Sequence, residues 1–241
     1  PSTSHFKKVH RLFGDDENRR VFQRSHNMLT VNEIFYSIQG ESTFAGFPCI
    51  FIRLTGCNLR CRYCDTQYAY TEGKDIPLDK ILETVKGFDC NLIEVTGGEP
   101  LIQKETPDLI SALIKHGYTV LLETNGSQDI RRVDTRCARI IDIKCPSSGM
   151  EKENLWKNLD YITPNDQLKF VIGYRQDYLY AKKVLNAASI KRNKKLTINF
   201  SPVFNEIDIK DLARWILEDN LPVKLQIQLH KYIWGDNAKG V

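Results

Sequence analysis

Short apolar runs alternate with amphipathic stretches along most of this 241-residue chain. Seven runs rich in β-branched residues predict strands, at residues 49–54, 92–96, 119–123, 139–143, 168–172, 196–200 and 224–229. Between these runs, apolar side chains recur at helical spacing and predict helices over residues 78–85, 109–114, 177–188 and 206–219. This alternation predicts an α/β fold with a mainly parallel sheet and right-handed crossovers.

Polar side chains gather on one face of four predicted strands, whereas the opposite faces are apolar. The polar positions are Glu94 and Thr96, Asp142 and Lys144, Asn199 and Ser201, and Gln226, Gln228 and His230. Parallel strands that are covered on both sides are normally apolar on both faces. Two interpretations therefore stay open: the polar side chains line the lumen of an open barrel that holds a polar ligand, or the sheet has one solvated face.

The sequence predicts one domain over residues 30–241, preceded by an arm at residues 1–29. The arm has no clear periodicity and carries six lysines and arginines against three acidic residues. Because the whole chain has a formal net charge of +4, the remaining body is close to neutral. A nucleic-acid surface needs clustered lysine and arginine, so we expect no nucleic-acid partner and favour a small molecule.

The sequence shows neither a membrane span nor a secretory signal. No stretch reaches about eighteen uninterrupted apolar residues, and residues 1–29 lack the order of a signal peptide. We therefore expect a cytoplasmic protein without membrane contact, in which the seven cysteines form no disulfides.

Three of the seven cysteines form a CxxxCxxC motif directly after a predicted strand, at Cys57, Cys61 and Cys64. Three thiolates on one short loop can bind three irons of a cubane cluster and leave the fourth iron open to an outside ligand. A structural zinc site would need a fourth protein ligand, for which Cys90 and His116 are the nearest downstream candidates. The spacing favours the cluster, and a zinc-binding interaction module stays as the alternative.

A second motif, Gly97-Gly98-Glu99-Pro100, follows the next predicted strand. Glycines allow the backbone to approach a ligand closely, although a Gly-Gly turn alone is a weak signal. Together the two motifs resemble the radical S-adenosylmethionine (SAM) superfamily. The resemblance implies a partial, open radical-SAM βα barrel, a [4Fe-4S] cluster on the three cysteines, and SAM on the open iron near Gly98. One-electron reduction would cleave SAM to methionine and a 5′-deoxyadenosyl radical, which abstracts a substrate hydrogen.

Four further segments are similar to the 7-carboxy-7-deazaguanine synthase family, at residues 33–41 (EIFYSIQGE), 51–54 (FIRL), 64–66 (CDT) and 228–232 (QLHKY). The family's implied substrate is 6-carboxy-5,6,7,8-tetrahydropterin, which loses ammonia on ring contraction to 7-carboxy-7-deazaguanine, a precursor of queuosine. The resemblance also implies Mg²⁺, an electron donor such as flavodoxin or ferredoxin, and a homodimer. Another radical-SAM enzyme, such as a glycyl-radical activase, stays as an alternative.

The resemblance implies roles for individual substrate-binding residues. The set is Ile38, Gln39, Gly40, Glu41, Arg53, Thr96 and His230. Gln39 and Glu41 would hydrogen-bond the edge of the pterin. Arg53 would bind the substrate carboxylate, and His230 would approach the pterin from the polar face of the last strand. The plainer interpretations are a polar turn for Gln39 and Glu41, a salt bridge at a strand end for Arg53, and a structural histidine.

The resemblance also implies metal and cofactor ligands. Thr66 resembles the family's magnesium ligand, since Mg²⁺ prefers oxygen donors, and a loop-capping hydroxyl is its plainer interpretation. The SAM-binding set is Gly98, Lys144, Ser201, Pro202, Val203 and Phe204, where the last four follow the sixth predicted strand. We expect the remaining cysteines, Cys49, Cys90, Cys137 and Cys145, to be packing thiols. Some family members end soon after the His-Lys-Tyr segment and bring their terminal carboxylate to the substrate, whereas this chain runs on to Val241.

Overall fold

One sheet organises the part of the chain that the computed structural model describes, which comprises residues 27–186, 190, 195–235 and 238–240. Its strands are β1 (Met28–Ile38), β2 (Pro48–Leu54), β3 (Lys74–Pro77), β4 (Leu92–Gly97), β5 (Thr119–Thr124), β6 (Ala138–Ile143), β7 (Gln167–Ile172), β8 (Thr197–Pro202) and β9 (Lys224–Leu225). Their order is β3-β1-β2-β4-β5-β6-β7-β8-β9. Neighbours from β2 to β9 pair in parallel, and β1 pairs antiparallel with β2 and β3. No pairing joins β3 to β9 in the described residues, so the barrel is open.

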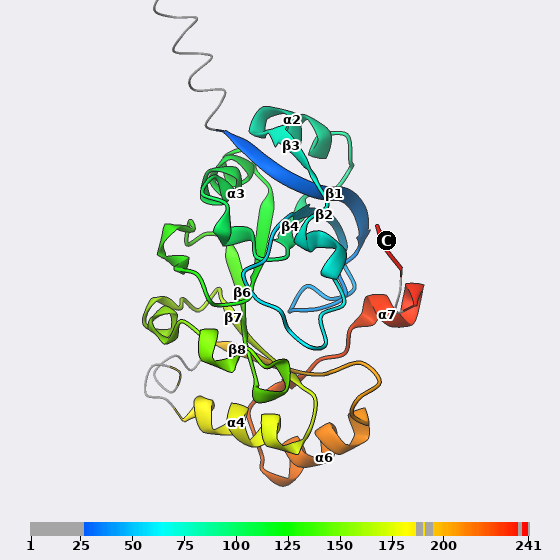
Figure 1. Cartoon of the computed structure of the whole chain (residues 1–241), viewed down its shortest axis with the longest axis vertical. Coiled ribbons are helices and arrows are strands. Elements are labelled where there is room, and N and C mark those ends of the chain that lie inside the picture. The colour runs from blue at the N-terminus through cyan, green and yellow to red at the C-terminus, as the bar shows by residue number, and fades with distance from the viewer. Residues whose placement is uncertain (1–26, 187–189, 191–194, 236–237, 241) are drawn as a thin grey trace, which may run out of the picture.

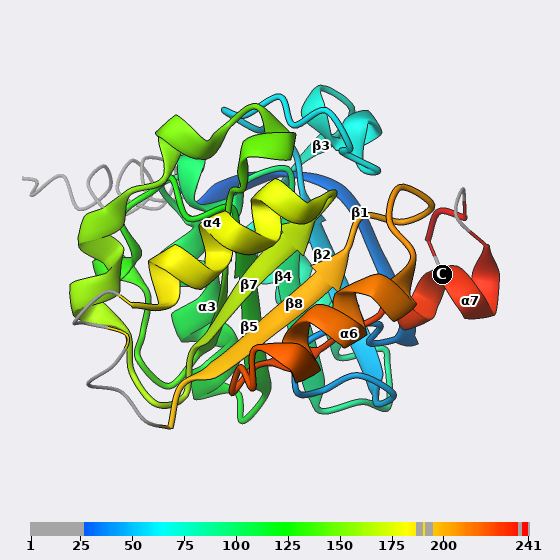
Figure 2. The ribbon, with the colours of Figure 1, turned by 90° about the horizontal axis from the view of Figure 1, so that it is seen from below.

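In the described residues, the α-helices that pack on the outer face of this sheet are α2 (Leu78–Val85), α3 (Thr106–Lys115), α4 (Arg175–Leu185) and α6 (Ile209–Glu218). Helix α7 (Leu229–Trp234) lies at the cavity on the other face instead. Short 3₁₀ helices lie at Gln67–Tyr70, Pro100–Ile102, Ile130–Arg132, Pro146–Ser148, Glu151–Glu153 and Trp156–Tyr161. Figure 2 shows α4 and α6 alongside β7 and β8, and Figure 1 shows α7 on the opposite side of the molecule from α3. None of the helices in the described part of the chain has the length and apolarity that crossing a bilayer would require.

The structure confirms the predicted mainly parallel α/β sheet. Six of the seven predicted strands lie within two residues of the predicted bounds, and helix 78–85 matches α2. Strand β1 begins at Met28, so the last two residues of the predicted arm belong to the sheet. Residues 1–26 of that arm, and residues 187–188 of the predicted helix 177–188, lie outside the described residues.

The predicted strand 224–229 is wrong in its second half. Strand β9 ends at Leu225 and helix α7 begins at Leu229, so His230 lies in the first turn of a helix and not on a strand face. The chain turns here because the Leu229 amide donates to the Gly40 carbonyl (3.0 Å) in the loop after β1. The sequence prediction also missed β1 and β3, because β1 is mostly half-exposed and β3 has only four residues.

Of the two interpretations of the polar strand faces, the structure supports the lumen of an open barrel. Glu94, Thr96, Asp142 and Lys144 are only 4–8% exposed, and all four line one cavity. The opposite strand faces form the hydrophobic core with the outer helices. All seven cysteines are free thiols; Cys49, Cys137 and Cys145 are buried and Cys90 packs against the core, which confirms the expected packing role of these four.

Candidate functional site

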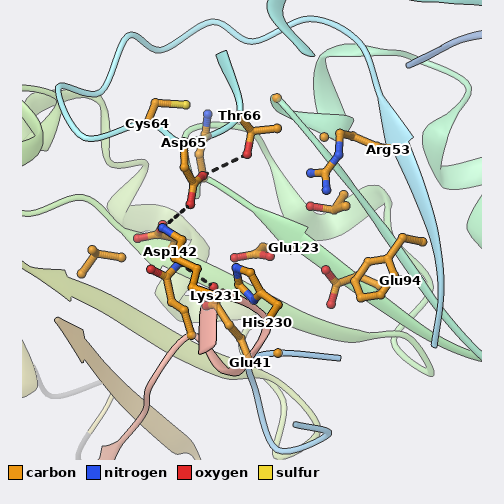
Figure 3. Close-up of a pocket in the computed structure, with 18 of the residues that line it drawn as sticks. Glu41, Arg53, Cys64, Asp65, Thr66, Glu94, Glu123, Asp142, His230 and Lys231 are labelled. Carbon is orange, nitrogen blue, oxygen red and sulfur yellow. Dashed lines mark hydrogen bonds and ion pairs between the residues drawn. The ribbon is translucent and has the colours of Figure 1, made fainter. Parts of the chain in front are cut away.

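A cavity of about 330 Å³ opens on the polar face of the sheet, and residues from both ends of the chain line it (Figure 3). The predicted site residues that line it are Ile38, Gln39, Gly40, Glu41, Arg53, Cys57, Cys61, Cys64, Thr66, Thr96, Gly98, Lys144, Val203, Phe204 and His230. Ser201 and Pro202 lie at the end of β8 and are not part of the cavity wall. The cavity thus places the cysteine motif and the predicted substrate residues around one space.

Two arginines stabilise the conformation and the position of the cysteine loop. Arg60 donates to the carbonyl oxygens of Cys57 (2.8 Å) and Leu59 (2.7 Å), and its guanidinium lies 4.3 Å from the centre of the Tyr70 ring. Arg62 donates through Nε to the Ser147 carbonyl (2.6 Å). These contacts hold a loop without regular secondary structure in one conformation at the cavity wall.

The Gly-Gly turn lies directly against this loop. Gly97 has φ +151°, and a β-carbon there would lie 2.1 Å from the Leu54 carbonyl oxygen. A β-carbon on Gly98 would lie 2.2 Å from the Gly56 carbonyl oxygen, so neither position tolerates a side chain. Glu99 is fully buried, and its carboxylate accepts from the Thr124 hydroxyl (2.8 Å) and the Asn125 amide (2.6 Å). The Glu99 carboxylate therefore anchors the turn to the end of β5. It does not line the cavity, whereas Gly97 and Gly98 do.

The thiols have surroundings that suit an iron–sulfur cluster. The Leu59 amide lies 3.4 Å and the Asn125 Nδ2 3.8 Å from the Cys57 sulfur, and such N–H donors stabilise cluster sulfurs. Burial raises the pKa of Cys57 and Cys61, which would favour neutral thiols in the absence of a cation. Bound iron reverses that preference because a coordinating thiol is deprotonated.

Beyond the cysteines, the wall carries buried polar atoms without a hydrogen-bond partner among the described residues. They include Asp142 Oδ1 and the Tyr63 hydroxyl. The other oxygen of Asp142 accepts from Lys144 Nζ (2.7 Å). Although burial favours the neutral amine, Asp142 raises the pKa of Lys144 above its usual value, so the ammonium stays charged. Polar atoms of this kind suit the amino, carboxylate and ribose groups of SAM.

The floor of the cavity is a buried network of acids around Lys169. The ammonium of Lys169 pairs with Glu41 and with Glu123 (2.7 Å). Burial alone would disfavour the charged forms of both groups. The ion pairs outweigh this effect, so the pKa of Lys169 is raised and the pKa of Glu41 is lowered. Glu94 accepts a hydrogen bond from Gln39 Nε2. Burial and the neighbouring carboxylates raise the pKa of Glu94 well above its usual value, which favours the protonated carboxyl.

Arg53 is already paired with an acid of the sheet. Its Nε donates to Glu33 Oε1 (2.7 Å), and the same oxygen accepts from the Tyr68 hydroxyl (2.9 Å). The salt bridge that was the plainer interpretation of Arg53 is therefore present. It occupies only Nε, and Figure 3 shows the guanidinium pointing into the cavity, where its outer nitrogens can bind a carboxylate.

Thr66 lies beside an acid–base pair at the cavity mouth. Its hydroxyl donates to Asp65 (2.9 Å), whose other oxygen binds Lys231 Nζ (2.8 Å), as Figure 3 shows. Although burial opposes ionisation, Lys231 lowers the pKa of Asp65 to about 2. The Thr66 and Asp65 oxygens supply the hard donors that Mg²⁺ prefers.

His230 enters the cavity from helix α7 and lies over Gly40. A β-carbon on Gly40 would lie 2.1 Å from the imidazole Nδ1, so only glycine leaves room for the ring. Next to it, Gln228 Nε2 donates to Glu41 (3.0 Å). Burial lowers the pKa of His230, which favours the neutral imidazole.

Sequence reasoning missed several residues of the wall. They are Tyr63, Tyr68, Glu123, Asn125, Lys169, Lys231 and Lys239. The strand pattern carried a signal for two of them, because Lys169 and Glu123 are charged side chains within predicted strands. Two others lie inside recognised motifs, Tyr63 in the cysteine motif and Lys231 in the QLHKY segment, but no role was assigned to them. No pattern in the sequence marks Tyr68, Asn125 or Lys239.

A family model described as "Radical SAM superfamily" matches residues 51–216 of the chain. The match covers more than half of the chain and contains the cysteine loop and the Gly-Gly turn. The protein is therefore of the radical SAM class, which implies a [4Fe-4S] cluster and SAM.

Individual relatives show to which family within the radical SAM class the chain belongs. The 7-carboxy-7-deazaguanine synthase of Chlorobaculum tepidum is 48% identical over 216 residues, which are 88% of this chain and 97% of that protein. The 7-carboxy-7-deazaguanine synthase of Koribacter versatilis is 41% identical over 227 residues, which are 88% of this chain and 100% of that protein. The chain belongs to the 7-carboxy-7-deazaguanine synthase family.

Solved structures agree with the fold. QueE from Escherichia coli matches with a TM-score of 0.72 and 23% identity, over 87% of this chain and 98% of that chain. Streptococcus suis SuiB bound to S-adenosylmethionine matches with a TM-score of 0.53 and 16% identity, over 72% of this chain and 48% of that chain. At these identities the two structures support the fold alone.

Proposed function

We propose that this protein is a radical-SAM carbon–nitrogen lyase that converts 6-carboxy-5,6,7,8-tetrahydropterin to 7-carboxy-7-deazaguanine, in queuosine and 7-deazapurine biosynthesis. The reaction comprises hydrogen abstraction, ring contraction and loss of ammonia. The observation that supports it most is that Cys57, Cys61 and Cys64 line the same cavity as Gln39, Glu41, Arg53 and His230. Relatives that align over nearly their whole length carry the name of this synthase.

The cofactors would be held at the cysteine side of the cavity. When bound, the cluster and SAM supply the one-electron chemistry that removes a carbon-bound hydrogen. The three cysteines would hold the cluster. Gly98, Lys144, Val203 and Phe204 would hold SAM, with Ser201 and Pro202 behind them in β8.

The substrate would be held at the acidic floor. Arg53 binds its carboxylate through the outer guanidinium nitrogens. The 2-amino-4-oxopyrimidine edge presents N–H donors beside a carbonyl acceptor, which suits Glu41 and Gln39. Ile38, Gly40 and Thr96 complete the wall.

Loss of ammonia requires groups that move protons. Glu94 and His230 both face the cavity, where burial favours the neutral form of each, and each can donate or accept a proton near the substrate. The ion pair of Lys169 and Glu41 lines the same floor, and burial with pairing shifts their pKa values away from neutral pH, so neither is the group that moves a proton.

The proposal includes a magnesium ion, an electron donor and a second copy of the chain. Thr66 would bind Mg²⁺ through its hydroxyl, and the ion would orient the substrate carboxylate as a Lewis acid. The exposed side chains of Asn58 and Arg60 bring the cysteine loop to the surface, where flavodoxin or ferredoxin would deliver an electron. The exposed aromatic side chains Tyr36 and Phe47 support a homodimer, and the free thiols support a cytoplasmic location.

The test is anaerobic turnover with the reconstituted holoenzyme, reductant, SAM, Mg²⁺ and the carboxypterin. We expect 7-carboxy-7-deazaguanine to accumulate together with ammonia. If 5′-deoxyadenosine forms slowly and no deazaguanine appears, the cofactors stand and the substrate is wrong.

A further inference from the structure

The cations that line the cavity differ in one respect. They are Arg53, Lys144, Lys169, Lys231 and Lys239. Arg53, Lys144, Lys169 and Lys231 each have a carboxylate within 4.0 Å, at Glu33, Asp142, Glu41 with Glu123, and Asp65 respectively. Lys239 has no carboxylate at that distance among the described residues. Its positive charge is therefore not neutralised by the described part of the wall.

Lys239 and Arg53 both lie within cation–π range of the ring of Tyr68. The Lys239 ammonium lies 4.3 Å from the ring centre, and the Arg53 guanidinium carbon lies 5.8 Å from the same centre. Tyr68 is fixed because its hydroxyl donates to Glu33 (2.9 Å). The ring holds a cation on its face by the cation–π interaction and leaves the ammonium hydrogens free for another partner.

The C-terminal segment that carries Lys239 is part of the cavity wall. Gly235, Ala238, Lys239 and Gly240 all line it, and Gly240 lies against the Glu33 carboxylate, from which a β-carbon would be 3.5 Å away. Lys239 and Gly240 thus lie on the side of the cavity where Tyr68 and Glu33 lie.

The net charge of the side chains around Arg53 and Tyr68 favours a second cation for binding a carboxylate. Arg53 and Glu33 form a pair with no net charge, so these two side chains alone offer a substrate carboxylate a neutral pair. With Lys239 these side chains carry a net charge of one positive unit, to which the proposed Mg²⁺ would add when bound. Two cations of different shape also discriminate more strongly against an uncharged ligand than one paired arginine does.

From these contacts we propose that Lys239 is a specificity-determining residue that supplies a second cation for the substrate carboxylate, in addition to Arg53. This inference rests on the proposed function, because the carboxypterin is the ligand. It assigns the preference for a carboxylated pterin over an uncharged one to the C-terminal segment.

The test compares two ligands on the anaerobic holoenzyme with SAM and without reductant. Equilibrium titration gives the dissociation constants of the carboxypterin and of 6-methyltetrahydropterin, which lacks the carboxylate. For Lys239→Met we expect about tenfold weaker binding of the carboxypterin and unchanged binding of the methylpterin. Lys239→Arg should retain the preference, and Lys210→Met, on the exposed face of α6, is the matched control that changes neither constant.

Turnover separates this inference from the function on which it rests. For Lys239→Met the carboxypterin KM should rise about tenfold while kcat stays within about twofold. Equal weakening of both pterins would assign Lys239 a purely structural role, and unchanged constants would remove it from the site; either result overturns the inference. If the wild-type enzyme forms no deazaguanine, the proposed function itself fails.

Discussion

The imidazole of His230 lies over Gly40 at a distance that only glycine permits, since a β-carbon at residue 40 would be 2.1 Å from Nδ1. These residues are far apart in the sequence, and the hydrogen bond from the Leu229 amide to the Gly40 carbonyl (3.0 Å) joins their segments. The loop after β1 and the first turn of α7 therefore form one unit of the site.

We predict that Gly40→Ala displaces the His230 ring and lowers kcat/KM for the carboxypterin by about tenfold or more, because misplaced groups cost rate steeply. The check is a double-mutant cycle with His230→Ala. Since both changes remove the same group, the double variant should be no worse than His230→Ala alone. Additive losses would show that Gly40 acts independently of His230. His116→Ala, an exposed histidine at the end of α3, is the control.

Among the charged residues of the site, Lys169 should be the one whose removal lowers the free energy of unfolding most. Lys169→Met leaves Glu41 and the partly exposed Glu123 without their shared counter-charge, which should cost about 3–5 kcal/mol of unfolding free energy. Anaerobic urea denaturation measures this, with Lys210→Met as the matched surface control. Adding Glu123→Gln to Lys169→Met should restore part of the loss. A cost below about 1 kcal/mol would mean that the network carries little stability.

Glu94 gives a prediction for the pH dependence of stability. Its pKa is raised well above the usual 4.5 because burial and neighbouring carboxylates disfavour the charge. The folded state therefore holds a proton that the unfolded state releases, and stability falls as the pH rises above about 4.5, by at most about 1.4 kcal/mol per pH unit. Glu94→Gln should abolish this slope and be more stable than wild type near pH 7. Parallel stability curves for the two proteins would show that Glu94 is ionised.

Thr66 gives a prediction for how turnover depends on the magnesium concentration. Thr66→Ala removes a hydroxyl ligand and should weaken the apparent magnesium affinity in turnover by about tenfold or more. Thr71→Ala, at the exposed end of the nearby 3₁₀ helix, should leave that affinity unchanged. An unaltered magnesium titration for Thr66→Ala would exclude Thr66 as a ligand.

The sequence was most informative where periodicity and motif spacing coincide. Parallel strands such as β4 and β6 are long apolar runs with polar residues on one face, so their bounds and the polar lumen could both be predicted. The cysteine loop and the Gly-Gly turn could be recognised because each motif has a fixed number of residues between its key positions. These local signals fixed the sheet, the cofactor side and the class of chemistry.

Features that depend on tertiary contacts could not be predicted in this way. The run after Leu225 alternates like a strand, yet it becomes α7 because its backbone bonds the loop after β1. Lys169 serves as the counter-charge of Glu41 only because β7 brings it to the floor, and Lys239 reaches Tyr68 only through the C-terminal segment. Neither pairing leaves a mark in local sequence.

The most direct test of the account is transfer of a label from substrate to cofactor product. The carboxypterin is deuterated at the carbon-bound positions of its reduced ring, and the holoenzyme turns it over anaerobically with SAM and Mg²⁺. We predict that deuterium enters 5′-deoxyadenosine while 7-carboxy-7-deazaguanine and ammonia form in equal amounts. Unlabelled 5′-deoxyadenosine without deazaguanine would contradict the claim that this cavity brings the pterin to the radical chemistry.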